Sequence, residues 1–211
     1  MPKKVWYAPN KFESYGEEEI KAVEACLRDG WLAGFGDRTV EFEKRVADLF
    51  GKKSGLFVNS GSSAILLGLC ALNLPKGSEV VTPACGFSTT VAPLVQLGLK
   101  PVFCDVGLNT YVPSVEDLKK VVTPDTKCLL LPNLIGNMPD WSAIRKAFPN
   151  VILFEDSADT ITHTPSTDIS TTSFYASHVI TAGGCGGMVM FNDEEHLKRA
   201  LMFRDWGRIG D

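Results

Sequence analysis

Three features that would each define a class of protein are missing from this sequence. Its apolar runs, of which residues 64–72 are among the longest, are far too short to span a bilayer. Its six cysteines are scattered without a CxxC pair, and most lie in apolar runs, where cysteine behaves as a small hydrophobe. The formal net charge is −4, with no basic arm or patch. These absences argue against a membrane protein, a cysteine metal site and a nucleic-acid-binding protein.

The amino-terminal residues also lack an apolar stretch after Lys3 and Lys4, so we expect no signal peptide. Cysteines without a disulfide-like spacing are typical of a reducing compartment, which predicts a cytoplasmic protein. The chain has 211 residues, of which 45% are hydrophobic and 22% charged, and this is enough to bury one substantial core.

The sequence does contain a regular alternation of two patterns. Short runs rich in Val, Leu or Phe predict strands over residues 55–60, 79–83, 101–106, 127–132, 151–156, 172–177 and 187–191. Apolar residues at helical spacing predict helices over residues 17–30, 39–51, 62–72, 87–98, 114–122, 140–148 and 193–203. Strands that alternate with helices predict an α/β fold with a largely parallel, buried sheet. We expect one domain over residues 16–211, preceded by an N-terminal arm over residues 1–15.

In such a sheet the functional side chains gather beyond the carboxyl ends of the strands. The first strand end is followed by Gly61, Ser62 and Ser63 at the start of a predicted helix. Small residues allow a tight turn there, and the free amides of a helix N-terminus can hold a phosphate group. A serine N-cap on an ordinary helix explains the same residues, so the local sequence leaves both interpretations open.

Two other strand ends carry ionisable side chains. Glu155 and Asp156 end a very apolar strand, where a carboxylate can pair with the cationic ring nitrogen of a pyridine cofactor or can cap the next helix. His178 follows a predicted strand and stands beside serines and glycines, a place suited to proton transfer. A structural histidine explains the same position, so the residues alone leave its role open.

The glycine cluster at residues 183–187 is a poor dinucleotide-binding signature. It lacks the GxGxxG order and precedes a strand rather than a helix. Its glycines suit a tight turn or a close approach of two backbone segments. This pattern counts against a plain dinucleotide-binding domain.

Taken in order, these stretches resemble the DegT/StrS-type sugar aminotransferases, which are vitamin-B6 enzymes of fold type I. The matching stretches are GWLAGFGDRTVEFEKRVADLFG, VNSGSSAILLGL, GSEVVTPACGFSTTVAPLVQLGLKPVFCDV, VILFEDSAD, SFYASHVITAGGCGGMVMFNDEE and RDWGR. They span the chain from about Ser14 to Arg208. The resemblance implies the large domain of that fold, a mostly parallel mixed sheet flanked by helices. It also implies that the family's small C-terminal domain is absent from this chain.

The resemblance implies roles for individual positions toward pyridoxal 5′-phosphate or pyridoxamine 5′-phosphate. The implied cofactor-binding residues are Gly61, Ser62, Ser63, Phe87, Asp156, Asp159 and Ser173. The serines match the phosphate cradle, Phe87 matches the aromatic side chain that stacks on the ring, and Asp156 matches the carboxylate that pairs with the ring nitrogen. Asp159 stands where the aminotransferases usually have glutamine. No metal ligand is expected among these residues. One branch of the dehydratases holds an iron–sulfur cluster through cysteines that follow the RDWGR stretch, and this sequence leaves that branch open.

His178 matches the lysine to which aminotransferases of this family attach the cofactor covalently. Without that lysine, ordinary transamination loses its covalent anchor and its proton shuttle, whereas an imidazole still moves protons. A subgroup with this lysine-to-histidine change consists of 3-dehydratases of nucleotide-linked 4-keto-6-deoxyhexoses, which bind pyridoxamine 5′-phosphate noncovalently. The resemblance therefore favours C3 dehydration of such a sugar, with His178 as the acid/base.

Two other functions remain open at this point. One is a sugar aminotransferase, and the other is a catalytically inactive or regulatory module that binds pyridoxal phosphate. The expected partners are a nucleotide-linked sugar and either a second copy of the chain, in a homodimer, or a separate chain that supplies the C-terminal domain. We expect neither a nucleic acid nor a membrane as a partner.

Overall fold

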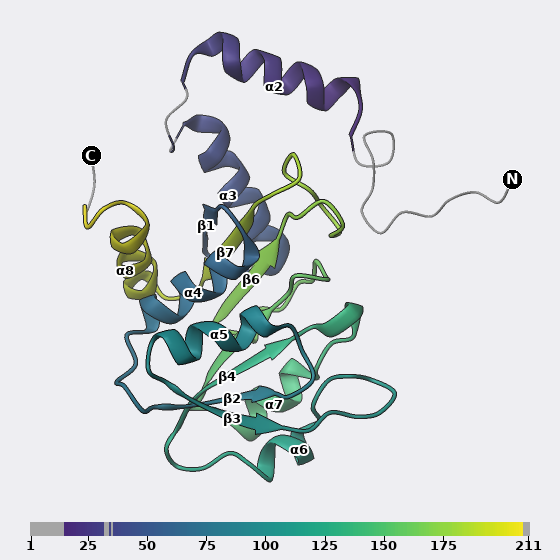
Figure 1. Ribbon diagram of the computed structural model, residues 1–211, viewed down its shortest axis with the longest axis vertical. Helices are drawn as coiled ribbons and strands as arrows, with labels where there is room; N and C mark the ends of the chain where they lie inside the picture. The colour runs from purple at the N-terminus through teal and green to yellow at the C-terminus, as the bar shows by residue number, and fades with distance from the viewer. Residues whose placement is uncertain (1–14, 32–33, 35, 209–211) are drawn as a thin grey trace, which may run out of the picture.

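The computed structural model describes residues 15–31, 34 and 36–208 (Figure 1). Of the N-terminal arm predicted over residues 1–15, all but Tyr15 lie outside the described residues. The strands are β1 (Ser54–Val58), β2 (Glu79–Pro83), β3 (Lys100–Cys104), β4 (Thr126–Pro132), β5 (Ile152–Asp156), β6 (Ile169–Ser173) and β7 (Gly187–Phe191). The helices are α2 (Glu17–Asp29), α3 (Asp37–Phe50), α4 (Gly61–Leu72), α5 (Ser88–Gln96), α6 (Val115–Lys119), α7 (Trp141–Ala147) and α8 (Glu194–Arg204), with a 3₁₀ helix, η1 (Leu134–Gly136).

The strands form one sheet in the order β1-β7-β6-β5-β4-β2-β3. Neighbours from β3 to β6 are parallel, whereas β7 is antiparallel to both β6 and β1. The alternation of patterns predicted an α/β fold with a largely parallel sheet, and the resemblance implied that the sheet is mixed; both predictions are confirmed. Because β7 runs opposite to its neighbours, its first residues lie at the edge where the other strands end.

Helices cover both faces of the sheet and bury it, as a parallel sheet requires. On one face α4 and α8 pack on a core that includes Leu130, Phe154 and Val189, and on the other α6 and α7 pack on a core around Leu129 and Leu153. The helix α4 lies very close to the sheet, since a Cβ at Gly68 would stand 2.6 Å from Cζ of Phe154.

One predicted strand is wrong in its position. The run TSFYAS predicted a strand over residues 172–177, but β6 is Ile169–Ser173. The error arises because this strand is polar yet fully buried, so it lacks the apolar signal. Its hydroxyls have buried acceptors: Ser170 Oγ donates to Glu155 Oε2 over 2.5 Å, and Thr172 Oγ1 donates to the Ser157 carbonyl over 3.0 Å.

The helix α2 stands away from the sheet in Figure 1. None of its side chains, all of which the structure describes, is buried. No helix within the described ranges is long and apolar enough to cross a membrane.

Candidate functional site

The candidate site lies at the edge of the sheet where the parallel strands end. Val58, Gly187 and Ser173 stand in register across β1, β7 and β6, and Asp156 pairs with Thr171 on the neighbouring strands. Segments that are far apart in the sequence therefore meet at one edge, and two of them end in the predicted site residues Asp156 and Ser173.

The start of α4 is capped by a serine, which is one of the two interpretations that the sequence left open. Ser60 is the N-cap, and its Oγ accepts a hydrogen bond from the Ser63 amide over 3.1 Å. The Ser63 hydroxyl stands 3.1 Å from the same oxygen, whereas Ser62 is exposed. The cap thus satisfies one of the four amides that a helix N-terminus leaves without a partner inside the helix.

Two glycines allow the backbone segments at this point to come together. A Cβ at Gly187 would stand 2.3 Å from the carbonyl carbon and oxygen of Ser60, a contact that no side chain can make. A Cβ at Gly61 would stand 2.9 Å from Cβ of Ser173. The glycine cluster is therefore a place of close backbone approach, and it brings Gly61 and Ser173, both predicted site residues, into contact.

Asp156 is almost completely buried, with 7% of its surface exposed. Its Oδ2 accepts a hydrogen bond from Thr90 Oγ1 over 2.8 Å. Burial raises the pKa of the Asp156 carboxyl to about 6, against the opposing effect of hydrogen bonds from Thr90 and from the Ala158 backbone. The carboxyl is thus poised to gain or lose its proton near neutral pH.

Phe87 is the N-cap residue of α5 and presents its ring to solvent, with 68% of the residue exposed. Its carbonyl accepts the Thr90 amide over 3.0 Å, so one helical turn joins Phe87 to the residue that contacts Asp156. A cavity of about 240 Å³ lies beside this turn. Its lining includes Thr82, Phe87, Thr90, Phe103 and Pro132.

His178 lies in the connection between β6 and β7, beyond the end of β6, and so not at the strand end that the sequence predicted. Its Nε2 stands 3.9 Å from Asp159 Oδ1. Its Nδ1 is buried and has no hydrogen-bond partner in the part of the chain that the structure describes. The ring of Tyr175 meets the imidazole edge-on, with 6.0 Å between the centroids.

The second carboxylate oxygen of Asp159, Oδ2, is held by the backbone. Oδ2 accepts a hydrogen bond from the Ile135 amide over 3.0 Å, which anchors the carboxylate to η1 and leaves Oδ1 toward His178. The arrangement can limit the orientation of the imidazole.

Glu155, the other acid at the end of β5, belongs to a buried polar network instead. Successive side chains of a strand point to opposite faces, so the side chains of Glu155 and Asp156 lie on opposite faces of the sheet. Asn133 Nδ2 donates to Glu155 over 2.7 Å, and the Thr164 hydroxyl also donates to it. Lys52 is buried near this network and donates to the Thr164 carbonyl. Burial lowers the pKa of Lys52 to about 8, although Glu155 acts to raise it.

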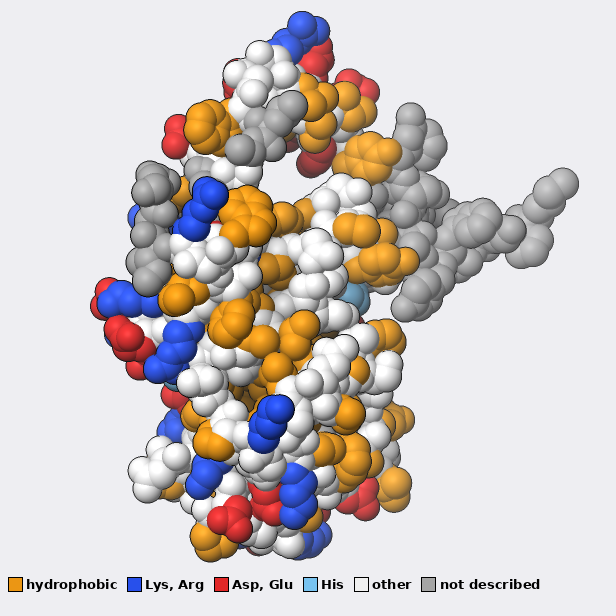
Figure 2. Space-filling model, turned by 60° about the vertical axis from the view of Figure 1, so that its left-hand side comes forward, with side chains coloured by type: hydrophobic (Ala, Val, Ile, Leu, Met, Phe, Trp, Pro, Cys, Tyr) orange, Lys and Arg blue, Asp and Glu red, His pale blue; other side chains and the backbone are white. Residues whose placement is uncertain are grey.

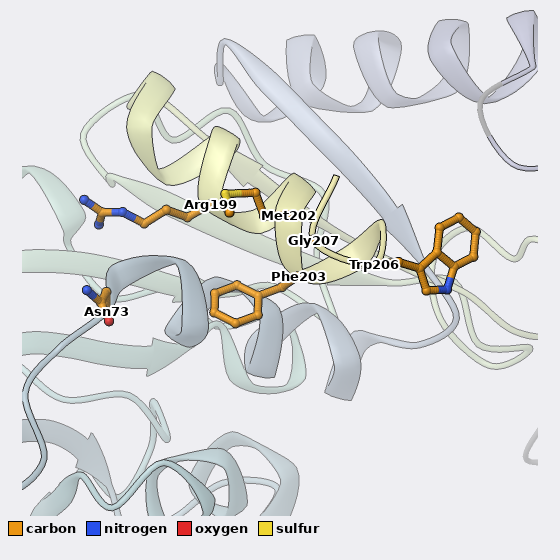
Figure 3. A pocket seen from close by; sticks show the side chains of 6 residues that line it. All are labelled: Asn73, Arg199, Met202, Phe203, Trp206 and Gly207. Atoms are coloured by element: carbon orange, nitrogen blue, oxygen red, sulfur yellow. The ribbon is translucent and has the colours of Figure 1, made fainter. Parts of the chain in front are cut away.

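A second hollow, of about 530 Å³, lies toward the opposite end of α4 (Figure 3). It is lined by Asn73, after α4, and by Arg199, Met202, Phe203, Trp206 and Gly207 from α8 and the residues that follow it. The hollow is apolar apart from the Arg199 and Asn73 side chains. It contains none of the predicted site residues.

The sheet and the helices around it define an α/β enzyme domain of the pyridoxal-phosphate fold type I class. The chain belongs to the DegT/DnrJ/EryC1/StrS aminotransferase family, whose model matches residues 13–210. This family consists of pyridoxal-phosphate-dependent enzymes that modify sugars.

Relatives of known identity include both dehydratases and aminotransferases. The chain is 38% identical to the lipopolysaccharide biosynthesis protein RfbH of Salmonella typhimurium, covering 92% of this chain and 48% of that protein. It is also 38% identical to the dTDP-4-dehydro-2,6-dideoxy-D-glucose 3-dehydratase of Saccharopolyspora spinosa, covering 91% and 45%. A sugar 4-aminotransferase of the latter organism is 32% identical.

A solved structure of GDP-4-keto-6-deoxymannose-3-dehydratase, with a trapped PLP-glutamate geminal diamine, superposes with a TM-score of 0.86 at 31% identity. The match covers 97% of this chain and 55% of that chain. The present chain thus spans about half the length of the curated relatives it matches.

Proposed function

We propose that this chain binds pyridoxamine or pyridoxal 5′-phosphate noncovalently and serves the C3 dehydration of a nucleotide-linked 4-keto-6-deoxyhexose. The proposal rests on the resemblance of the motif around His178, in which a histidine matches the family's lysine. The position of His178 next to Asp159 is consistent with a role at the site. Dehydratases among the relatives are consistent with the proposal.

The residues at the edge of the sheet fit such a cofactor. The N-terminus of α4 at Gly61, next to Ser173, suits a phosphate group, because helix amides and small side chains surround the point where the two segments touch. The hydroxyls of Ser62 and Ser63 are further donors there. The exposed ring of Phe87 suits a flat heterocycle, and the buried Asp156 suits a cationic ring nitrogen.

When bound, the cofactor supplies an electron sink for charge that develops next to the C4 position of the sugar. In this proposal Asp156 keeps a proton on the ring nitrogen, and its ionised form is stabilised by that cation. In this proposal His178 accepts a proton and returns it, as an imidazole can near neutral pH. Asp159, 3.9 Å from Nε2, would limit the orientation of the imidazole.

The first test replaces the histidine with the lysine of the aminotransferases. We expect the wild-type protein to bind pyridoxal phosphate and to show its absorbance band. Borohydride should not attach the cofactor covalently to the chain, because His178 cannot bond covalently to the cofactor. His178→Lys should give a cofactor that borohydride fixes covalently, as peptide mass spectrometry would locate. The matched control is His196→Lys on α8, which should behave as the wild type.

Covalent fixation in the wild type would point to another lysine and contradict the proposal. A sugar aminotransferase is the second candidate, since one relative with that activity is 32% identical. Amino transfer from glutamate to a keto-sugar by the wild type, without loss of the C3 hydroxyl, would favour it. Cofactor binding with no turnover of any keto-sugar would favour an inactive or regulatory module.

A further inference from the structure

Thr90 lies between the two side chains that would hold a flat cationic ring. It is on the first turn of α5 and 3% exposed. Its hydroxyl donates to Asp156 Oδ2 over 2.8 Å, and its amide donates to the Phe87 carbonyl over 3.0 Å. One residue therefore joins the exposed aromatic ring of α5 to the buried carboxylate of β5.

The surroundings of Asp156 make this hydrogen bond important. The charged groups that act on Asp156 are Asp159 and Glu155, and both are acids that disfavour its ionised form, as burial does. The groups that favour the ionised form are two hydrogen-bond donors, the Thr90 hydroxyl and the Ala158 amide. The hydroxyl is the one of these two that a side-chain substitution can remove.

Thr82 offers a natural comparison within the same cavity. It is 1% exposed, and its Oγ1 is buried without a hydrogen-bond partner among the described residues. Both threonines line the cavity of about 240 Å³ beside Phe87. The two hydroxyls thus share a place in the fold, but only that of Thr90 contacts Asp156.

We propose that Thr90 is a positioning residue that fixes the Asp156 carboxylate relative to Phe87, so that a flat cationic ring meets both. The identity of that ring as the cofactor rests on the proposed function, but the effect of Thr90 on Asp156 does not. Thr90 acts through Asp156 and Phe87 and takes no proton itself.

The test follows the Asp156 carboxyl in the cofactor-free protein by carbon-13 NMR, with the resonance assigned through Asp156→Asn. Thr90→Val keeps the side-chain shape and removes the donor, so the titration midpoint of Asp156 should rise by about one pH unit. Thr90→Ser retains a hydroxyl and should restore the wild-type midpoint. Thr82→Val is the matched control and should also leave the midpoint unchanged.

A Thr90→Val midpoint equal to that of the wild type, or an equal shift in Thr82→Val, would overturn the inference. A second measurement, the affinity for pyridoxal phosphate at pH 7, should fall about tenfold in Thr90→Val and stay unchanged in Thr82→Val. Equal affinity in Thr90→Val and the wild type would also count against the inference. Failure of the wild type to bind pyridoxal phosphate would instead refute the proposed function, while the NMR midpoints would still decide the role of Thr90.

Discussion

Two adjacent carboxylates illustrate how far a residue's chemistry depends on its surroundings. Glu155 points into a network of amide and hydroxyl donors, whereas Asp156 points to the site and accepts a side-chain hydrogen bond from Thr90. Burial raises the pKa of Asp156 from 3.8 to about 6. At the residue scale, the ionised Asp156 carboxyl therefore lowers the free energy of unfolding relative to a side chain that carries no charge.

This effect predicts a pH dependence. Between pH 3.8 and about 6 the folded protein holds a proton that the unfolded chain has released, so the free energy of unfolding falls as the pH rises through this window. Asp156→Asn cannot ionise, and at pH 8 we expect it to be more stable than the wild type by about 1–3 kcal/mol. Most of this gain should disappear at pH 4, as urea unfolding at both pH values would measure.

The exposed Asp125→Asn provides the control, since it should change stability little at either pH. An Asp156→Asn gain of the same size at pH 4 and pH 8 would show that packing, and not ionisation, accounts for it. Asp156→Asn should also weaken pyridoxal-phosphate binding, so stability and function are opposed at this position.

At the scale of elements, the site depends on the contact of β7 with the start of α4. Gly187→Ala would place a carbon 2.3 Å from the Ser60 backbone, so the two segments must move apart. We expect a loss of roughly 3 kcal/mol or more in the free energy of unfolding. The loss is large because the added carbon meets the Ser60 backbone, which cannot move aside as the end of a flexible side chain can. Chemical denaturation followed by circular dichroism would measure it.

Gly86→Ala is the matched control for a glycine near the site. A Cβ there meets only the Pro132 Cγ, at 3.8 Å, and the Gly86 backbone lies outside the left-handed region. This variant should be as stable as the wild type or gain about 0.4–1 kcal/mol. If both alanine variants kept wild-type stability, the close approach of β7 and α4 would not be essential.

Most elements could be predicted from the sequence because local patterns determine them. Apolar runs located six strands within a few residues, and Gly51 ends α3 with a left-handed φ of 68°. The strand β6 was misplaced because its burial depends on Glu155, which a local pattern cannot reveal. The local pattern did not show which strand is antiparallel, although the resemblance implied a mixed sheet.

The candidate site divides in the same way. Asp156 and Gly61 follow strands and could be singled out from their position alone. The assignments of Phe87 and Ser173 needed the family resemblance. Thr90 was missed because its role depends on a hydrogen bond to Asp156, which is far away in the sequence. Only the folded arrangement of α5 over β5 makes that contact visible.

At the scale of the whole molecule, a large apolar surface is exposed. Ile20, Val23 and Leu27 form a stripe on α2, and Phe203 and Trp206 are exposed on and after α8. Figure 2 shows hydrophobic side chains on α2 and on the body below it. Monomeric soluble proteins rarely expose patches of this kind, so the predicted homodimer or complementing chain has a surface to bind.

We therefore expect the chain to self-associate at micromolar concentration, as sedimentation velocity would measure. Leu27→Glu should weaken association at least about tenfold, since a charge in an apolar interface is costly. Because α2 has no buried side chain within the described residues, the unfolding midpoint at high dilution should stay unchanged. Lys21→Glu on the same helix serves as the control, and a wild type that is monomeric at all concentrations would contradict the prediction.

The pairing of β1 with β7 has a consequence for how the protein is made. Val58 pairs with Gly187 and Ser54 with Phe191, so β1 is synthesised long before the strand that pairs with it. Such non-local pairing is slow, and the waiting strand edge is prone to wrong partners. A nascent chain on the ribosome would therefore carry β1 and α4 unfinished until β7 emerged. The part of the site where α4 meets β7 therefore forms only after β7 has been synthesised.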